Sequence, residues 1–413
     1  MKRKLKMRLF FPKWEKIPEQ TPYDLPPLGV IQVAGCLPEW VDVELFNENV
    51  QEIELDGDYD IAGISIMLTA QALRAYEISA YLRARGKTVI LGGQHVTMCP
   101  EEASNHADAI LIGEAEGLID KIVEDYCEGK LQKIYRQNGF PDISNAPAPR
   151  RDLHDKAGLY TVRGWEMMDL IQTSRGCKFN CYPCSVTYLE GAKLRTKRIE
   201  RVLQDVQRCS RRIFIVDNSL DQDIEYQKSL ISALSGIGKR WVSHPINPIP
   251  SMLKLAADAG WWYVYLAIYK MSEKVRDRVK MYHDYGIGVE GTVMLGLDYH
   301  TEDFIKKLVD FLLEIKLDLA EFTIVTPFPH SRIYHQMEAE GRIIDRNWNN
   351  YNTAKVVFKP KNMTPERLAE LYRWAWKYFY SSESQNTKMA KLLVRAKSDT
   401  GHKASQSVTK GVT

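Results

Sequence analysis

Three cysteines within eight residues form the most chemically specific pattern in the chain. Cys177, Cys181 and Cys184 have the spacing C-x3-C-x2-C. They directly follow the apolar run 168–172, which predicts a short buried strand. Thiolates bind soft metals, and three of them on one tight loop can reach a single metal centre. The alternative is three free, buried cysteines that happen to cluster.

The number of ligands separates the possible metal centres. A structural zinc site uses four ligands, usually in pairs. No fourth Cys or His follows at zinc-finger distance, because the next cysteine is Cys209 and the next histidine is His244. Three thiolates for a four-iron cluster leave one iron open for chemistry. The pattern therefore predicts an open iron–sulfur site.

The residues that flank the cysteines resemble those of the radical S-adenosylmethionine (radical SAM) superfamily. The chain has Thr173-Ser-Arg-Gly before Cys177 and Ser185 after Cys184. The resemblance implies that the three cysteines hold a 4Fe–4S cluster whose open iron binds SAM. It also implies that an electron from a donor such as ferredoxin or flavodoxin cleaves SAM to a 5′-deoxyadenosyl radical. The family usually has an aromatic residue before the third cysteine; here Pro183 stands there, with Tyr182 one place earlier, and we expect both near the adenine.

Length, composition and charge limit the class of protein. The chain has 413 residues, enough for two domains and an appendage. Its 56 Lys and Arg against 53 Asp and Glu give a net charge of +3, which argues against a nucleic-acid partner. The other four cysteines are scattered, which indicates reduced thiols in a cytoplasmic, low-oxygen setting. The longest uncharged apolar run, 259–269, is about half a membrane span, so we predict no transmembrane segment.

The N-terminal part alternates between strand and helix patterns. The predicted strands are 5–11, 41–46, 59–67, 87–93 and 107–114, and the predicted helices are 26–37, 70–85 and 116–128. This alternation predicts an α/β, doubly wound (Rossmann-like) parallel sheet over residues 1–137, with a ligand crevice at the carboxyl ends of the strands. The candidates at those ends are Ser65, Thr69, Gly92, Gly93, Gln94, Gly113 and Glu114. The alternative is that these are ordinary turns between strands and helices.

The same stretch resembles the cobalamin-binding domain that precedes some radical SAM domains. The matching pieces are Pro26-Pro-Leu-Gly29, Leu91-Gly-Gly-Gln-His95 and Ile112-Gly-Glu114. The resemblance implies that the seven strand-end candidates contact cobalamin. Relatives that ligate cobalt from below often carry a histidine after the first strand, and the loop 12–18 has none. We therefore expect cobalamin without a histidine lower ligand; His95 is a weak candidate ligand and is predicted to be a pocket-wall or surface residue.

The rest of the chain reads as a linker, a second strand–helix series and an appendage. Residues 138–167 are rich in proline and predict a linker in which Arg150 and Arg151 form a solvated hinge rather than a contact to a cofactor phosphate. Residues 168–345 predict a partial (β/α)6 barrel with its site at the strand ends, which is also what the family resemblance implies. Its predicted elements are strands 168–172, 212–219, 241–246, 262–268, 288–296 and 320–326, and helices 195–209, 225–236, 250–260, 272–284 and 301–316.

The barrel supplies further candidates, and the C-terminal part supplies few. The resemblance implies SAM contacts from Gly296 and Thr326, and Asp217 is a candidate that could instead cap the next helix. Tyr269 and His330 depart from the family pattern, which marks an altered substrate or cofactor contact. Residues 346–395, with helix 364–380, predict a small aromatic-rich helical appendage, and residues 396–413 predict a disordered tail.

The predicted function is that of a cobalamin-dependent radical SAM C-methyltransferase acting on an unactivated carbon. Its substrate would be a lipid, a tetrapyrrole or a protein side chain. The first alternative is an enzyme of the same layout that catalyses a non-methylating cyclisation, hydroxylation or carbon–carbon coupling. The second is a non-catalytic iron–sulfur or cobalamin carrier.

Overall fold

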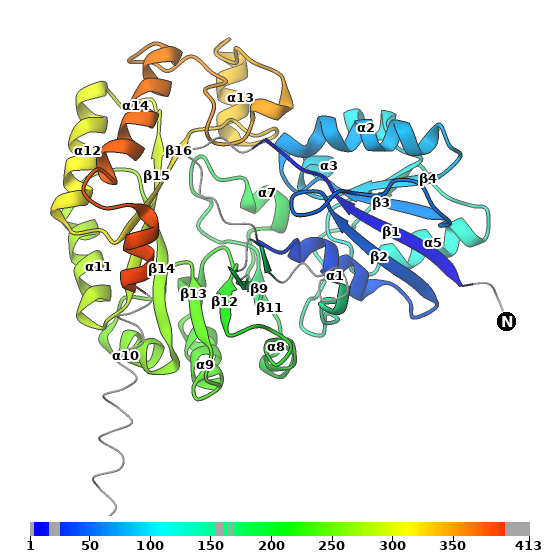
Figure 1. Ribbon diagram of the computed structural model, residues 1–413, viewed down its shortest axis with the longest axis horizontal. Helices are drawn as coiled ribbons and strands as arrows, with labels where there is room; N and C mark the ends of the chain where they lie inside the picture. Colours follow the sequence, from blue (N-terminus) through cyan, green and yellow to red (C-terminus); the bar gives the residue numbers. More distant parts are fainter. Residues whose placement is uncertain (1–3, 16–24, 154–160, 163–164, 167, 393–413) are drawn as a thin grey trace, which may run out of the picture. The chain divides into compact units, whose positions relative to one another are not determined.

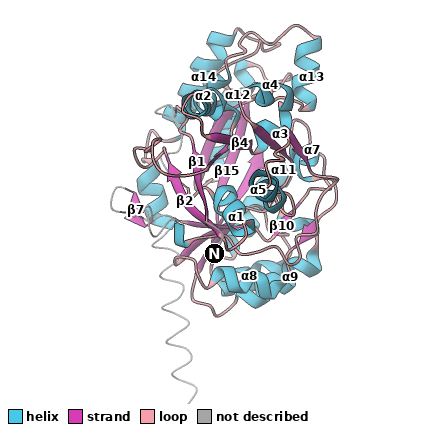
Figure 2. Ribbon diagram, turned by 90° about the vertical axis from the view of Figure 1, so that its right-hand side faces the viewer, coloured by secondary structure: helices cyan, strands magenta, loops and turns pink. Residues whose placement is uncertain are grey.

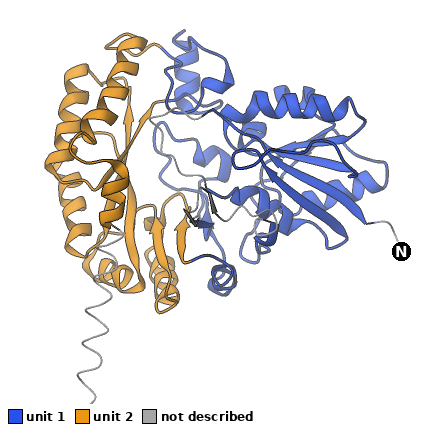
Figure 3. Cartoon of the chain, in the orientation of Figure 1, with its two compact units in different colours: residues 1–18, 22–210, 326–358 blue, residues 19–21, 211–325, 359–413 orange. Residues whose placement is uncertain are grey.

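The computed structural model divides the chain into two compact units (Figure 3). Unit 1 comprises residues 1–18, 22–210 and 326–358, and unit 2 comprises residues 19–21, 211–325 and 359–413. The structure describes residues 4–15, 25–153, 161–162, 165–166 and 168–392. The predicted tail 396–413 and part of the predicted linker lie outside these residues, and the predicted domain boundaries stay a prediction.

Unit 1 begins with a six-stranded parallel sheet in the order β2-β1-β3-β4-β5-β6. Its strands are β1 (Leu5–Phe11), β2 (Val41–Asn47), β3 (Ile61–Ser65), β4 (Thr88–Gly92), β5 (Ala109–Ile112) and β6 (Ile134–Arg136). The strand order changes direction between β1 and β3. In open parallel sheets a ligand crevice forms at such a switch point, beyond the carboxyl ends of the strands.

Helices cover both faces of this sheet (Figure 1). On one face, α1 (Leu28–Cys36) and α5 (Ile119–Cys127) pack on Leu9, Ile61 and Leu111. On the other face lie η1 (Thr69–Gln71), α2 (Ala72–Arg83), α3 (Gln94–Met98) and α4 (Pro100–Asn105). Their apolar side chains pack on residues such as Phe10 and Ile64. Because two helical layers bury the two faces of one parallel sheet, the predicted doubly wound domain is confirmed.

The remainder of unit 1 consists of short elements. They are β7 (Thr161–Val162), β8 (Trp165–Glu166), β9 (Asp169–Ile171), β10 (Ser174–Arg175), α7 (Val186–Glu190), β11 (Arg195–Thr196), α8 (Ile199–Val206), α13 (Arg332–Ala339) and η3 (Trp348–Asn350). The predicted helix 195–209 is wrong at its start. Arg195 and Thr196 pair antiparallel with β10, and the helix begins at Ile199.

Unit 2 contains five parallel strands in chain order, each connected to the next through a helix. The strands are β12 (Arg212–Ile215), β13 (Arg240–Ser243), β14 (Trp261–Ile268), β15 (Gly288–Leu295) and β16 (Leu319–Ile324). The helices are η2 (Leu220–Gln222), α9 (Ile224–Leu234), α10 (Pro250–Ala259), α11 (Glu273–Asp284), α12 (Glu302–Glu314) and α14 (Pro365–Phe379). With β9, the strand–helix series has the six strands of the predicted partial barrel. Figure 2 distinguishes the helices and strands of both units.

Of the predicted C-terminal appendage 346–395, residues 346–358 belong to unit 1, and helix α14 packs on the barrel series of unit 2. Helix α14 lies against α12 and β16. Phe322 of β16 contacts the rings of Trp376 and Phe379, with centroids 5.6 and 5.9 Å apart. Tyr372, Trp376 and Phe379 of this helix therefore pack a core face, whereas Tyr378 is exposed. Within the described part of the chain, no helix combines the length and the apolar character needed to cross a membrane.

Candidate cofactor sites

A glycine turn starts the cysteine loop. Gly176 has a φ of +87°, and a Cβ at this position would overlap the carbonyl oxygen of Lys193. Only glycine fits, because other residues are strained at this φ and the backbone of Lys193 fills the space where a side chain would begin. The amide of Gly176 donates to a Glu190 carboxylate oxygen at 3.3 Å. The Arg175-Gly176 turn predicted from the sequence is thus required by two independent features of the backbone.

The three cysteines lie on the loop that this turn opens. The Cys177 amide donates to the Gly191 carbonyl at 3.0 Å, and the Cys184 amide donates to the Cys181 carbonyl at 2.9 Å. Cys177 is half-buried, whereas Cys181 and Cys184 are exposed, so the alternative of three buried cysteines is wrong. Desolvation and the nearby thiols of Cys177 and Cys181 raise the pKa of Cys184. Thiolate donors of this number fit an iron–sulfur cluster, although among the described residues no three Cys, His, Asp or Glu side chains already form a metal site.

Four buried charges hold the base of this loop. Arg175 Nη1 lies 2.5 Å from Glu114 Oε2, and Arg175 Nη2 lies 2.7 Å from Glu116 Oε1. Arg195 forks onto the same Glu114 carboxylate at 2.5 and 3.0 Å. The side chains of the four residues are only 9–12% exposed. Although burial alone would raise it, the Arg175 guanidinium holds the pKa of Glu116 below its ordinary value.

This network was not predicted from the sequence. Glu114 is predicted to contact cobalamin, and in the structure its carboxylate accepts hydrogen bonds from two arginines that lie 61 and 81 residues further along the chain. No local pattern identifies partners at such separations. The one available signal was the coincidence of two charged motifs, Gly113-Glu114-Ala-Glu116 and Ser174-Arg175, at predicted strand ends.

The glycines predicted for cobalamin lie at the carboxyl ends of adjacent strands. Ser65 and Gly92 are paired at the ends of β3 and β4. Gly93 has a φ of +108°, and a Cβ there would lie 2.6 Å from the Ile66 carbonyl oxygen. Thr97, which the sequence did not single out, ties two of these turns together. Its Oγ1 donates to the Gly93 carbonyl at 3.1 Å and accepts from the Gly113 amide at 3.0 Å.

Two buried polar atoms at this edge have no hydrogen-bond partner among the described residues. They are Oγ1 of Thr69, which is 1% exposed, and Nδ1 of His95, which is 0% exposed. Buried polar atoms are normally satisfied, so their presence here fits a ligand that supplies hydrogen bonds. By contrast, Gln94 is exposed. A Cβ at Gly92 would meet only Leu111, at 3.8 Å, which leaves that backbone open to close approach.

The prediction that His95 is a surface residue is wrong, because its side chain is fully buried. Its Nε2 lies 3.2 Å from the Tyr76 hydroxyl and 3.7 Å from Glu102. The ring packs on Trp348, whose indole N–H donates to the Glu102 carboxylate at 2.9 Å. His95 and Glu102 therefore tie the sheet domain to the segment 326–358 of unit 1.

Of the SAM candidates in unit 1, Tyr182 and Pro183 lie on the cysteine loop itself. The Tyr182 hydroxyl donates to Gln336 of α13 at 2.9 Å, and the ring of His330 stacks on Tyr188 of α7 with centroids 5.6 Å apart. Thr326 is buried and begins the segment that leads to α13. Pro183 is half-buried beside Tyr182. This segment thus contacts the cysteine loop through Tyr182 and Tyr188.

The SAM candidates of unit 2 lie at the carboxyl ends of β12 and β15. Asp217 is fully buried and its carbonyl oxygen is hydrogen-bonded to His244 Nδ1. The N-cap position of the next helix, η2, is Ser219, and Asp223 caps α9 by accepting from the Tyr226 amide. Gly296 has a φ of +94° and its amide donates to His300 Nδ1 at 3.2 Å. The roles of these residues toward SAM stay predictions.

The prediction that Arg151 belongs to a solvated hinge in the linker 138–167 is wrong. Its guanidinium is 4% exposed and forks onto Asp205 at 2.7 and 2.9 Å, with Asp169 at 3.0 Å. The linker is therefore anchored to α8 and β9 at this point. Arg150 is more exposed and pairs with Asp152.

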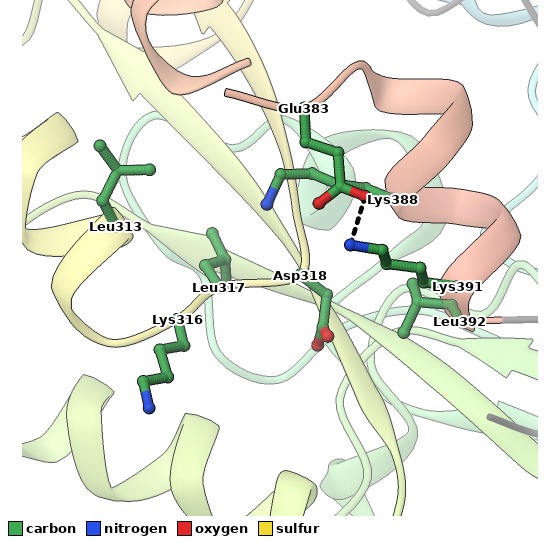
Figure 4. Close-up of a pocket in the computed structure, with 8 residues that line it drawn as sticks. All are labelled: Leu313, Lys316, Leu317, Asp318, Glu383, Lys388, Lys391 and Leu392. Atoms are coloured by element: carbon green, nitrogen blue, oxygen red, sulfur yellow. Dashed lines mark ion pairs between the residues drawn. The ribbon is translucent and has the colours of Figure 1, made fainter. Parts of the chain in front are cut away.

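A surface pocket of unit 2 carries none of the candidate residues (Figure 4). It lies at the amino end of β16, away from the carboxyl ends of the strands. Its lining residues are Leu313, Lys316, Leu317, Asp318, Glu383, Lys388, Lys391 and Leu392. Glu383 pairs with Lys391 across it at 2.7 Å.

Known proteins resemble the chain over most of its length. The B12-binding domain family matches residues 18–123. The bacteriochlorophyllide d C-8(2)-methyltransferase of Chlorobaculum tepidum is 26% identical over 387 residues, which cover 84% of this chain and 85% of that protein. The hopanoid C-2 methylase of Rhodopseudomonas palustris is 22% identical over 364 residues, covering 78% and 66%.

A solved structure shows the same fold. The radical SAM methyltransferase TsrM from Kitasatospora setae, with cobalamin and a [4Fe-4S] cluster bound, superposes with a TM-score of 0.63 at 14% identity. The match covers 82% of this chain and 78% of that protein. Cobalamin, a 4Fe–4S cluster and SAM are the cofactors of the family that these findings indicate. In sequence the chain thus resembles cobalamin-dependent and radical SAM methyltransferases along most of its length, and it shares the fold of one of them.

Proposed function

We propose that the chain is a cobalamin-dependent radical SAM C-methyltransferase that methylates an unactivated carbon of a tetrapyrrole. Cys177, Cys181 and Cys184 hold the 4Fe–4S cluster, and the strand-end residues Ser65, Thr69, Gly92, Gly93 and Gly113 line the cobalamin site. When bound, the cluster with SAM supplies a hydrogen-abstracting radical and cobalamin supplies the methyl group.

The observation that carries the proposal is the closeness of the two cofactor-binding segments within unit 1. Glu114, two residues after the end of β5 in the matched B12-binding region, is bonded to Arg175, two residues before Cys177. Helix α3, which follows Gly93, lies beside α7, which follows Cys184 (Figures 1 and 2). A reaction that uses both cofactors requires such closeness, whereas a carrier of either one does not.

The protein residues of both segments act by binding and orientation. Gly92 and Gly93 admit a bulky ligand close to the backbone. The hydroxyl of Thr69 and the ring nitrogen of His95 offer hydrogen bonds inside a buried edge, where they count for more than in water. The cysteine loop presents exposed thiols at Cys181 and Cys184, where a cluster and SAM can reach them.

The choice of a tetrapyrrole rests on the relatives. The bacteriochlorophyllide methyltransferase is more similar to this chain, and over a larger share of both chains, than the hopanoid methylase. The preference is therefore one of degree, and lipids and protein side chains are the competing substrate classes in the test.

Anaerobic reconstitution with iron, sulfide, cobalamin and a strong reductant tests the proposal. With SAM and a bacteriochlorophyllide we expect a product that is one CH2 heavier, together with S-adenosylhomocysteine and 5′-deoxyadenosine. 5′-Deoxyadenosine without methylated product from any substrate class would favour a non-methylating reaction, and its complete absence would favour a carrier. The variant Cys181→Ala should lose the cluster's visible absorbance; retained absorbance and activity would overturn the cysteine assignment.

A further inference from the structure

We propose that Glu114 is a positioning residue that clamps the base of the cysteine loop and fixes that loop to the cobalamin-binding sheet. The inference rests on the proposed role of the loop in holding the cluster. It concerns the residues of unit 1 alone, and the loop is defined as residues 176–194.

The loop is closed by an unusually short ladder. Ser174 and Arg175 on one side pair antiparallel with Thr196 and Arg195 on the other. All three cysteines lie between these two strands. Two residues on each side form too small a sheet to be stable alone, so the closure of the loop depends on what its side chains contact.

The ladder places two like charges opposite each other. Arg175 and Arg195 are directly paired, and side chains at such positions lie on the same face of a sheet. Like charges at directly opposite positions destabilise a strand pair. Both guanidiniums are also largely buried, with side chains 9% and 12% exposed, so water screens their repulsion poorly.

Glu114 relieves this repulsion because it is bonded to both arginines. Its Oε2 lies 2.5 Å from Arg175 Nη1 and 3.0 Å from Arg195 Nη1, and its Oε1 lies 2.5 Å from Arg195 Nη2. Glu116 adds a second carboxylate on Arg175 alone, so the four charges sum to zero. Glu114 is thus the one residue of the network that joins the two strands of the ladder.

The rest of the surroundings is consistent with a clamp. Arg195 also donates to the carbonyls of Pro141 and Glu190 at 2.7 and 2.9 Å, which belong to the linker and to the loop itself. Glu114 directly follows Gly113, whose amide is held by Thr97. The carboxylate therefore sits on a fixed part of the sheet domain, which sets where the cysteine loop begins and ends.

Hydrogen–deuterium exchange on the full-length chain, purified without cluster, tests the clamp. In Glu114→Gln the two arginines lose the negative charge of the carboxylate that they share. We expect the loop amides to exchange at least tenfold faster than in the wild type, with the exchange rates of β1–β4 unchanged. The matched control is Glu48→Gln. Glu48 is 7% exposed and is bonded to Arg74, which is 32% exposed, at 2.7 and 3.0 Å, so this variant removes an equally buried carboxylate charge without touching the loop.

A double variant separates charge repulsion from packing. If Glu114 acts by neutralising two facing arginines, Glu114→Gln with Arg195→Gln should exchange more slowly than Glu114→Gln alone. If it acts by packing only, the double variant should exchange faster than either single one. Faster exchange in the double variant than in either single variant would overturn the proposal. So would equal rates of loop exchange in Glu114→Gln and Glu48→Gln. Should Glu114→Gln fail to fold, Arg195→Lys can replace it in the test. This variant keeps the positive charge but cannot donate to both oxygens of Glu114, so the loop amides should still exchange faster than in the wild type.

A second measurement links the clamp to the cluster. After reconstitution, Glu114→Gln should show an altered electron paramagnetic resonance signal of the reduced cluster upon SAM addition, with iron content near that of the wild type. The two proposals can fail separately. If the loop amides exchange as expected in Glu114→Gln but the wild type makes no methylated product, the proposed reaction is refuted and the clamp is not.

Discussion

The glycine turn before the first cysteine provides a sharp test of how the loop is built. In Gly176→Ala the new Cβ would meet the Lys193 carbonyl oxygen, with the carbonyl carbon at 3.0 Å and the Glu190 carbonyl oxygen at 3.2 Å. Backbone atoms cannot swing aside as a side chain can, so the strands at the loop base would have to separate. A φ of +87° adds strain for any residue with a Cβ.

The cost can be worked from these contacts. A left-handed conformation costs an L-residue about 1–2 kcal/mol. Overpacking against fixed atoms costs about 1–3 kcal/mol, and loss of the Cys177 amide bond to Gly191 costs about 1 kcal/mol. We therefore expect Gly176→Ala to destabilise the loop by roughly 3–6 kcal/mol, the sum of these three terms.

Gly129 offers a matched control in the same unit. Its φ is +68°, and no atom lies within 4 Å of the position that a Cβ would occupy, so Gly129→Ala should cost only the strain of about 1 kcal/mol. Thermal unfolding and iron content after reconstitution measure the two variants. We expect Gly129→Ala to bind iron normally and Gly176→Ala to bind little. Equal iron content and equal melting temperatures in the two variants would refute the reasoning.

Two further predictions concern buried charges elsewhere. Burial, with Glu321 nearby, raises the pKa of Glu290 to about 8 from its ordinary value of 4.5. The folded chain therefore binds the Glu290 proton more tightly than the unfolded chain does. The stability that this protonated carboxyl contributes is fully present below pH 4.5 and is lost as the pH rises toward 8. The melting temperature of Glu290→Gln should therefore equal that of the wild type at pH 4.5 and exceed it by several degrees at pH 8.5. Equal melting temperatures of the two proteins at both pH values would contradict this prediction. In Asp205→Asn the buried Arg151 keeps, among the described residues, only Asp169 as an ion-pair partner, and urea unfolding should show a loss of about 3 kcal/mol, close to the cost of breaking a buried pair. A loss below about 1 kcal/mol would mean that Asp169 alone neutralises Arg151.

The order of the main elements could be predicted because it depends on local patterns. Alternating apolar residues and glycine or proline at element ends place β1, α2 and β14 within two or three residues of where they lie. The short elements could not be predicted in this way. Helices α3 and α4 and the two-residue strands β10 and β11 are too brief to show a period, and tertiary contacts determine them.

The candidate site divides in the same way, and Glu114 shows why. Its place after β5 predicted a functional residue, because charged residues at the carboxyl ends of parallel strands lie beside the ligand crevice. The same position also brings them against whatever chain segment covers that crevice. In this protein Glu114 lies against the two ends of the cysteine loop, where Arg175 is opposite Arg195. A carboxylate bonded to both arginines uses three of its roughly four acceptor positions within the protein, so we expect its main effect on a cofactor to pass through the loop that it holds.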